Sequence, residues 1–179
     1  MSDSRNLLME SYMQRSMMIN IPDKDWEKIV TRQKTVIVQR KCPDADTIRW
    51  SWKIQHRPII YLYNESGGVF AESRCEITMP NSWVGISNSD YKQNPKKYFR
   101  EETILNEKVN LDGTCMTMRE FRDYVKLGKH CYFTIKELTV YEISLPIDAF
   151  YIGRVGRNGI FAPDEKFIQP RGWCYALKK

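Results

Sequence analysis

The sequence predicts an α+β domain, built as a small mixed β-barrel with helices at its periphery. Runs of β-branched and aromatic residues outnumber the amphipathic helical stretches. The helical stretches interrupt the series of strands instead of alternating with it, which is typical of this class. A chain of 179 residues with 42% hydrophobic side chains is long enough for one self-supporting core. We expect one domain over residues 23–179, preceded by an N-terminal helix or arm over residues 1–22.

Composition excludes several classes of protein. The five cysteines lie far apart with no C-x-x-C pair, which argues against a disulfide framework and against a structural zinc site. We therefore expect no metal and no cofactor. No apolar stretch approaches the ~18 residues of a membrane-spanning helix, and the N-terminus lacks the apolar run of a secretory signal. These features predict a cytoplasmic protein without a membrane partner.

The charge balance favours a polyanionic partner. Twenty-eight Lys and Arg residues stand against 22 Asp and Glu residues, so the formal net charge is +6. A basic surplus of this kind favours RNA or DNA as a partner, although many basic proteins bind neither.

The first half of the chain reads as a helix followed by strands. Asp23 is a plausible N-cap, and Trp26, Ile29 and Val30 follow at helical spacing, which predicts a helix ending near Gln33. A β-branched run at residues 34–40 and a segment at residues 48–53 that alternates with period two predict two strands. Two further strands, at residues 57–63 and 69–79, form a hairpin around a turn with two glycines.

The second half contains a long loop, a helix and further strands. Residues 80–114 read as loop, and Thr117 with Glu120 forms a capping box that opens a helix before Gly128. Residues 130–143 predict one long strand or a bent pair of strands, and residues 146–151 predict one helical turn. A loop over residues 153–167 and a last strand over residues 173–177 follow.

Aromatic and basic residues supply the candidate binding groups. Trp50 and Trp52 would share one strand face, where they either pack in the core or, in the case of Trp52, line a groove that stacks a base. Tyr63 and Trp173 are further candidates for ligand contact. A long loop interleaves aromatic residues with the candidate phosphate-binding residues Lys92, Lys96, Lys97 and Arg100.

A second set of candidates surrounds the strand at residues 34–40. Lys34 and Arg40 could contact phosphate, or could simply be solvated charges at a sheet edge. Glu72, on the returning strand of the hairpin, could face Lys34 and form a proton-transfer pair with it, or could pair with a neighbouring basic residue.

From residue 23 to residue 177 the chain resembles the ASCH domains of the PUA-like superfamily. The resemblance rests on the helix that leads directly into Lys34-Thr35, the Arg57-to-Tyr63 hairpin strand, and the ending Pro170-Arg171-Gly172-Trp173-Cys174-Tyr175. In the family's G-x-K-x-x-E-x-R element Lys34 matches, whereas Arg32, Ile37 and Gln39 stand in place of Gly, Glu and Arg. The resemblance implies a five- to six-stranded barrel, a cleft beside the first helix, and RNA or nucleotide binding.

The resemblance also raises the question of catalysis. One subgroup of the family resembles an amidohydrolase for acetylated cytidine, which uses a Lys, a Thr three residues later and a Glu in the hairpin. Lys34 and Glu72 occupy two of these positions, but Ile37 stands where the Thr nucleophile is needed.

We therefore expect a binding module for nucleic acid or a modified nucleotide, with RNA favoured, rather than an enzyme. The alternative is a small amidohydrolase- or ribonuclease-like hydrolase that acts on a nucleoside or RNA through Lys34 and Glu72. A protein partner that contacts residues 1–20 is a third hypothesis.

Overall fold

The computed structural model describes residues 16–80, 111–126, 128–155, 161–164 and 172–179. In chain order the elements are β1 (Met17–Asn20), α2 (Asp23–Val30), β2 (Val36–Gln39), α3 (Ala45–Ser51), η1 (Ile54–His56), β3 (Ile59–Asn64), β4 (Gly68–Thr78), α7 (Met118–Val125), β5 (Cys131–Leu145), η3 (Ile147–Ala149), β6 (Phe150–Val155), β7 (Phe161–Pro163) and β8 (Trp173–Lys178). None of the helices described is long and apolar enough to cross a membrane.

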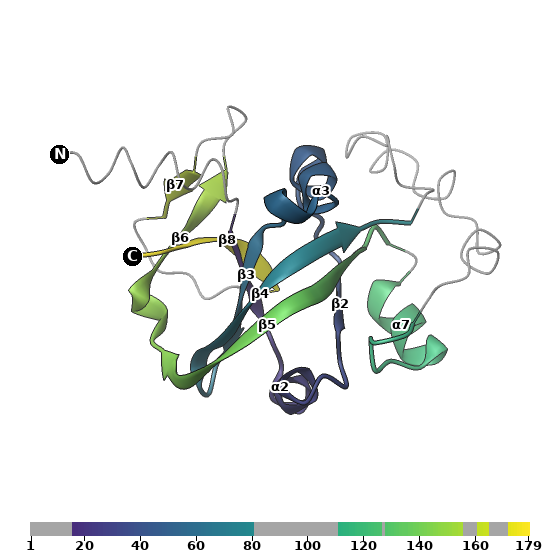
Figure 1. The fold of residues 1–179 in the computed structure, drawn as a ribbon. Helices are drawn as coiled ribbons and strands as arrows, with labels where there is room; N and C mark the ends of the chain where they lie inside the picture. The colour runs from purple at the N-terminus through teal and green to yellow at the C-terminus, as the bar shows by residue number, and fades with distance from the viewer. Residues whose placement is uncertain (1–15, 81–110, 127, 156–160, 165–171) are drawn as a thin grey trace.

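The strands form one mixed sheet in the order β2-β5-β4-β3-β1-β8-β6-β7. Only β1 and β3 run parallel, and the other neighbours are antiparallel. The sheet lies between α3 at the top and α2 at the bottom of Figure 1. The α+β class is confirmed, but the predicted barrel of five to six strands is not: the described strands form one open sheet of eight strands, in which no ladder joins the edge strands β2 and β7.

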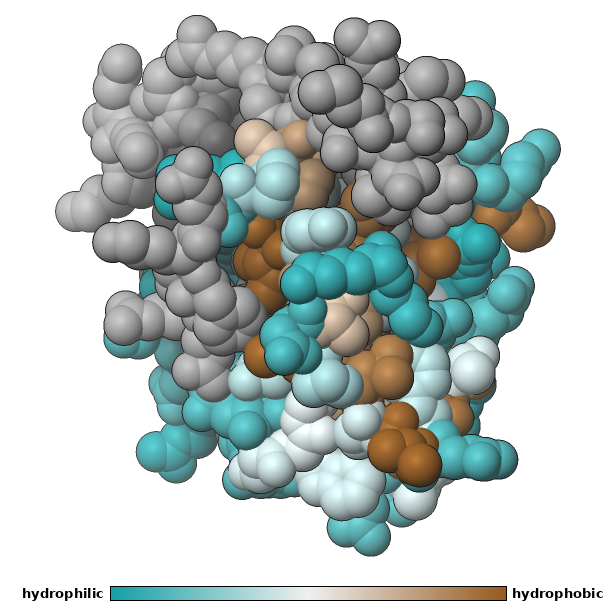
Figure 2. All heavy atoms as spheres, turned by 90° about the vertical axis from the view of Figure 1, so that its left-hand side faces the viewer, coloured by the Kyte–Doolittle hydropathy of each residue, from teal (hydrophilic) through white to brown (hydrophobic). Residues whose placement is uncertain are grey.

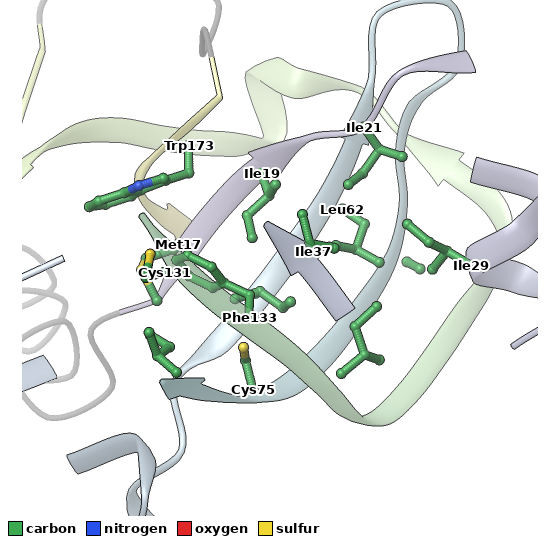
Figure 3. Close-up of a cluster of buried hydrophobic side chains, with 14 of the residues drawn as sticks. Met17, Ile19, Ile21, Ile29, Ile37, Leu62, Cys75, Cys131, Phe133 and Trp173 are labelled. Carbon is green, nitrogen blue, oxygen red and sulfur yellow. The ribbon is translucent and has the colours of Figure 1, made fainter. Parts of the chain in front are cut away.

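The main core lies inside the curved sheet. It contains buried side chains from six strands and from α2 and α3, including Met17, Ile19, Ile29, Ile37, Ile48, Leu62, Ile77, Phe133 and Trp173. Figure 3 shows Ile37 of β2 close to Leu62 and Ile19 on the opposite wall. The edge strand β2 therefore packs through its side chains on strands with which it shares no backbone ladder.

The described part of the N-terminal segment is a strand instead of the expected helix or arm. Met17–Asn20 pairs in parallel with β3 and antiparallel with β8, so β1 lies within the sheet. Met17, Met18 and Ile19 have no exposed surface. Strands buried on both faces read as short unbroken apolar runs, without the alternation that marks a half-exposed strand.

The strand predicted at residues 48–53 is wrong, because α3 and the turn after it occupy this segment. The carboxylate of Asp44 caps the helix by accepting hydrogen bonds from the backbone N–H of Thr47 at 2.9 Å and from its hydroxyl at 2.7 Å. Ile48 and Ser51 then turn inward at helical spacing. Trp50 and Trp52 consequently do not share a strand face.

Most of the other predicted elements are confirmed, with one addition. The helix from Asp23, the hairpin β3–β4, the capping box of α7, the long strand β5 and the last strand β8 are all present. The loop predicted at residues 153–167 instead contains the end of β6 and all of β7. Most of the loop predicted at residues 80–114 lies outside the described residues.

Candidate functional site

A pocket of about 840 Å³ lies beside the edge strand β2. We call it the seam pocket. Its walls come from the end of β1, from α2, from β2, from residues 115–124 at and before α7, and from Gly172 just before β8. In the described residues β2 is an edge strand of the open sheet, so a backbone ladder joins it on one side only.

Lys34 lies in this pocket, and its ammonium group is already paired. Its Nζ atom is 2.9 Å from Oδ2 of Asp25 in the first turn of α2, and the two side chains are 9% and 13% exposed. Both residues line the pocket. The pair therefore gives the wall one donor group and one acceptor group, rather than a lone cation.

Gln39 lies at the end of β2, beside Gly172. It is 7% exposed, lines the pocket, and pairs through its backbone with Cys131 of β5. Gly172 has a φ of +106°, which favours glycine, and a Cβ atom there would come within 3.2 Å of Oε1 of Gln39. The carbonyl of Gly172 accepts a hydrogen bond from the backbone N–H of Asn20 at 2.6 Å, which fixes this wall to β1.

The opposite wall is supplied by α7 and the residues before it. Tyr124 is 38% exposed and lines the pocket together with Met116. Burial raises the pKa of the Tyr124 hydroxyl, which lies against the backbone of Arg40. Because Phe121 and Val125 of the same helix are fully or almost fully buried, α7 is held firmly and presents Tyr124 from a rigid position.

The described lining is more acidic than basic. It includes five carboxylate residues, Asp23, Asp25, Glu65, Glu120 and Asp123, and three lysines, Lys24, Lys28 and Lys34. Anionic groups are repelled by such a lining, whereas neutral or cationic groups that donate hydrogen bonds are favoured. The interior therefore suits a neutral heterocycle better than a phosphate.

The side chain of Glu72 does not lie in the same site as that of Lys34. Its Oε2 atom accepts a hydrogen bond from the Tyr141 hydroxyl at 2.5 Å, and Glu72 is not among the described residues that line the seam pocket. Tyr61, its partner in the β3–β4 register, belongs to a second cluster that is separate from the main core. Lys34 and Glu72 therefore do not form the predicted proton-transfer pair in this structure.

Two of the predicted aromatic residues have structural roles away from the pocket. Trp173 is 5% exposed, its indole N–H donates to the carbonyl of Lys41, and the Lys41 ammonium lies 4.7 Å from the ring centroid. Its side chain thereby joins the start of β8 to the chain just after β2. Tyr63 is buried in the second cluster.

Trp52 and Arg40 are both exposed and do not line the pocket. Trp52 is 50% exposed after α3, and its indole N–H donates to the carbonyl of Ile77 at 2.8 Å. Arg40 directly follows Gln39, and its backbone lies against the hydroxyl of the pocket-lining Tyr124, so it lies beside the seam pocket. The loop residues Lys92, Lys96, Lys97 and Arg100 lie outside the described residues, and their phosphate contacts stay a prediction.

Sequence reasoning missed three residues that shape the pocket, namely Asp25, Gln39 and Tyr124. Tyr124 belongs to an apolar helical stripe, which by itself indicates only packing. Gln39 stands at the Arg position of the ASCH register, but nothing local indicates which side chains surround it. Asp25 reads as one acidic residue in the first turn of a helix, a favourable position for helix stability alone.

Exposed hydrophobic side chains elsewhere form no comparable site in the described residues. Ile143 is 82% exposed on β5 and Tyr151 is 38% exposed on β6. Figure 2 shows the side that lies on the left in Figure 1, and its brown side chains lie between teal and white ones. The described residues also contain no group of three or more His, Cys, Asp and Glu that could hold a metal ion.

Comparison with known proteins gives matches among solved structures. No family model and no curated protein matches the chain. Three crystal structures of the ASCH protein of Zymomonas mobilis match, each at 12% sequence identity. A serine-to-alanine mutant has a TM-score of 0.49 and the match covers 91% of this chain and 89% of that one, and for a tyrosine-to-phenylalanine mutant the TM-score is 0.46 and the coverages are 90% and 89%. For the protein named without a mutation the TM-score is 0.44 and the coverages are 90% and 87%. These structures carry the name of the family that the sequence resembles.

Proposed function

We propose that this protein binds one nucleobase in the seam pocket, either in a free or modified nucleoside or nucleotide or in one residue of an RNA chain. The observation that carries the proposal is the pocket itself. Its volume of about 840 Å³ lies within the ~300–1,000 Å³ range of small-molecule sites, and its lining mixes apolar, aromatic and polar groups.

The lining offers the contacts that a base needs. Tyr124 is partly exposed and lines the pocket, so its ring is our candidate for stacking on a heterocycle, a contact worth ~1–3 kcal/mol per base. Ile37, Val38 and Met116 supply apolar surface around it. The Lys34–Asp25 pair and the Gln39 carboxamide can hydrogen-bond to the edge of the ring.

The charge distribution favours a base inside the pocket and phosphate outside it. Carboxylates outnumber lysines in the described lining, whereas the whole chain carries a net charge of +6. Arg40 follows the pocket-lining Gln39 and is exposed, so it is our candidate for phosphate contact at the mouth. The loop residues Lys92, Lys96, Lys97 and Arg100 would extend this contact along an RNA strand.

The hydrolase alternative gains no support from the geometry. It requires Lys34 and Glu72 in one site, but Lys34 pairs with Asp25 and Glu72 binds Tyr141. Ile37, which stands at the position of the Thr nucleophile, lines the pocket as an apolar residue. We therefore expect binding without turnover.

The test is a binding titration with a matched pair of tyrosine variants. Nucleosides, nucleoside monophosphates and single-stranded RNA are titrated by calorimetry or anisotropy into the wild type, Tyr124→Leu and Tyr151→Leu. Tyr151 has the same 38% exposure but lies on β6, outside the described lining. We expect Tyr124→Leu to weaken binding at least about five-fold, as the loss of one stacked base requires, and Tyr151→Leu to leave it unchanged.

A salt series separates base contact from phosphate contact. Base-in-pocket binding predicts that a free nucleoside binds with little salt dependence, whereas RNA binding weakens with salt in proportion to the phosphates contacted. No binding by any of these probes, or equal losses in both tyrosine variants, would overturn the proposal.

A further inference from the structure

The side chain of Gln39 is an unused hydrogen-bonding group inside the seam pocket. It is 7% exposed and lines the pocket, and its carboxamide makes no hydrogen bond in the described structure. Its Oε1 and Nε2 atoms are not among the described buried side-chain atoms that lack a partner, so they reach solvent in the pocket. A carboxamide that has no protein partner and faces the space of a pocket can give all its hydrogen bonds to a ligand bound there.

The backbone of Gln39 is fixed, and its carboxamide lies beside Gly172. The backbone of Gln39 is fixed in the β2–β5 ladder opposite Cys131. Gly172, fixed to β1 through Asn20, lies so close to Oε1 that a Cβ there would come within 3.2 Å. A side chain that is mostly buried on a fixed backbone loses less conformational freedom when a ligand binds than an exposed side chain would.

Several other polar groups of the pocket are already partnered, and the lysines Lys24 and Lys28, which are not, are more exposed than Gln39. Lys34 and Asp25 bind each other, and Glu120 caps α7 by accepting a hydrogen bond from the backbone N–H of Thr117 at 2.7 Å. Asp23 accepts a hydrogen bond from the side-chain amide of Asn64 at 2.8 Å. Gln39 stands apart from these residues in the described lining because no protein group competes with the ligand for its hydrogen bonds.

We infer that Gln39 is the specificity-determining residue of the seam pocket, and that it reads a ligand edge on which a hydrogen-bond donor and an acceptor lie side by side. A carboxamide offers one acceptor oxygen and two N–H donors in one plane. An amino group beside a ring nitrogen, as in adenine and cytosine, matches this pattern, and Gln forms such paired hydrogen bonds with adenine. This inference rests on the proposed function and narrows its ligand class.

The experiment compares nucleosides that differ only in the amino group. Adenosine is compared with purine riboside, and cytidine with pyrimidin-2-one riboside, by calorimetric titration into the wild type. Loss of the amino group leaves the carboxamide oxygen of Gln39 without its donor. We expect the ligand without the amino group to bind at least about five-fold more weakly in at least one pair, within the range for one base contact.

Three variants test the role of Gln39 itself. Gln39→Met keeps the length of the side chain and removes both hydrogen-bonding groups, so it should bind the two members of each pair equally. Gln39→Glu replaces the donor by a second acceptor, so it should shift preference toward guanosine, whose N1–H and N2 amino group are adjacent donors. Gln55→Met is the control, because Gln55 is exposed in η1 and does not line the pocket.

Thermal denaturation separates this role from a structural one. Because Gln39 gives up no protein hydrogen bond, Gln39→Met should keep or raise the melting temperature while it abolishes discrimination. A structural glutamine would show the reverse, with lower stability and unchanged discrimination. If Gln39→Met fails to fold, that result contradicts the inference, and the Gln39→Glu preference provides an independent check.

The outcomes distinguish this inference from the proposed function. If nucleosides bind and Tyr124→Leu weakens them, but Gln39→Met discriminates as the wild type does, Gln39 is not the specificity-determining residue and the proposed function stands. If no nucleoside binds the wild type, both fail.

Discussion

The ammonium group of Lys34 and the carboxylate of Asp25 form an ion pair of 2.9 Å at the wall of the seam pocket. The pair joins the segment before β2 to the first turn of α2. Both side chains are mostly buried, so each charge depends on the other to offset the loss of water. The lysine that the sequence marks for phosphate contact is thus part of the architecture of the pocket.

Breaking this pair should destabilise the fold. We expect Lys34→Met to lower the free energy of unfolding by about 3 kcal/mol, because it leaves Asp25 without its counter-charge in a mostly buried place. Adding Asp25→Asn should recover part of this loss. Urea denaturation at pH 7 measures both effects. Arg49→Met breaks an exposed pair with Asp46 and should cost less than about 1 kcal/mol, and strictly additive losses in the double variant would contradict the coupling.

Substitution of Gly172 should disturb both stability and the pocket. Its φ of +106° disfavours any side chain, and the added Cβ would press on the Gln39 carboxamide. We expect Gly172→Ala to lower the free energy of unfolding by about 1–3 kcal/mol and to weaken ligand binding. Gly67→Ala is the control, because the nearest atom to its added Cβ is 4.0 Å away. Equal effects of the two substitutions would count against a special role for Gly172.

The five thiols should differ in their reaction with iodoacetamide. Cys115 is exposed and lines the pocket, and hydrogen bonding with the Cys131 thiol lowers the pKa of Cys42. Burial raises the pKa of the Cys75, Cys131 and Cys174 thiols, in the last case to about 12. Because the thiolate is the reactive form, peptide mass spectrometry should find Cys115 and Cys42 modified first. Bound nucleoside should slow the reaction of Cys115 alone.

Stability should fall in alkaline solution. Burial, with the Glu72 carboxylate as the second cause, raises the pKa of Tyr61 to about 12. The unfolded chain, with an ordinary tyrosine pKa of about 10, releases this proton first, so stability is fully present below pH 10 and is lost between pH 10 and 12. The slope for this group is at most about 1.4 kcal/mol per pH unit.

Urea denaturation across this pH range measures the slope, and Tyr61→Phe should make it shallower. An unchanged slope in the variant would show that Tyr61 does not titrate in this range in a way that is linked to unfolding.

The sequence by itself determined the elements whose signals are local. The hairpin β3–β4 follows from two apolar runs around Asn64-Glu65-Ser66-Gly67-Gly68, and α7 follows from the capping box of Thr117 and Glu120. Lys34 could be proposed as a site residue because it directly follows the predicted helix and matches the Lys of a family element. In each case the residues that decide the structure lie within a few positions of one another.

The tertiary structure alone decided β1 and the seam pocket. For α3 the alternation from Ile48 to Lys53 favours a strand, whereas the Asp44 cap on Thr47 is a local signal for the helix. The contact of the Asp44 carboxylate with the Tyr175 hydroxyl, at 2.7 Å, adds a distant one. Gln39 and Gly172 lie far apart in the sequence, and the tertiary fold brings them together. A ligand site built at an unclosed edge depends on such distant contacts, for which local sequence patterns carry no signal.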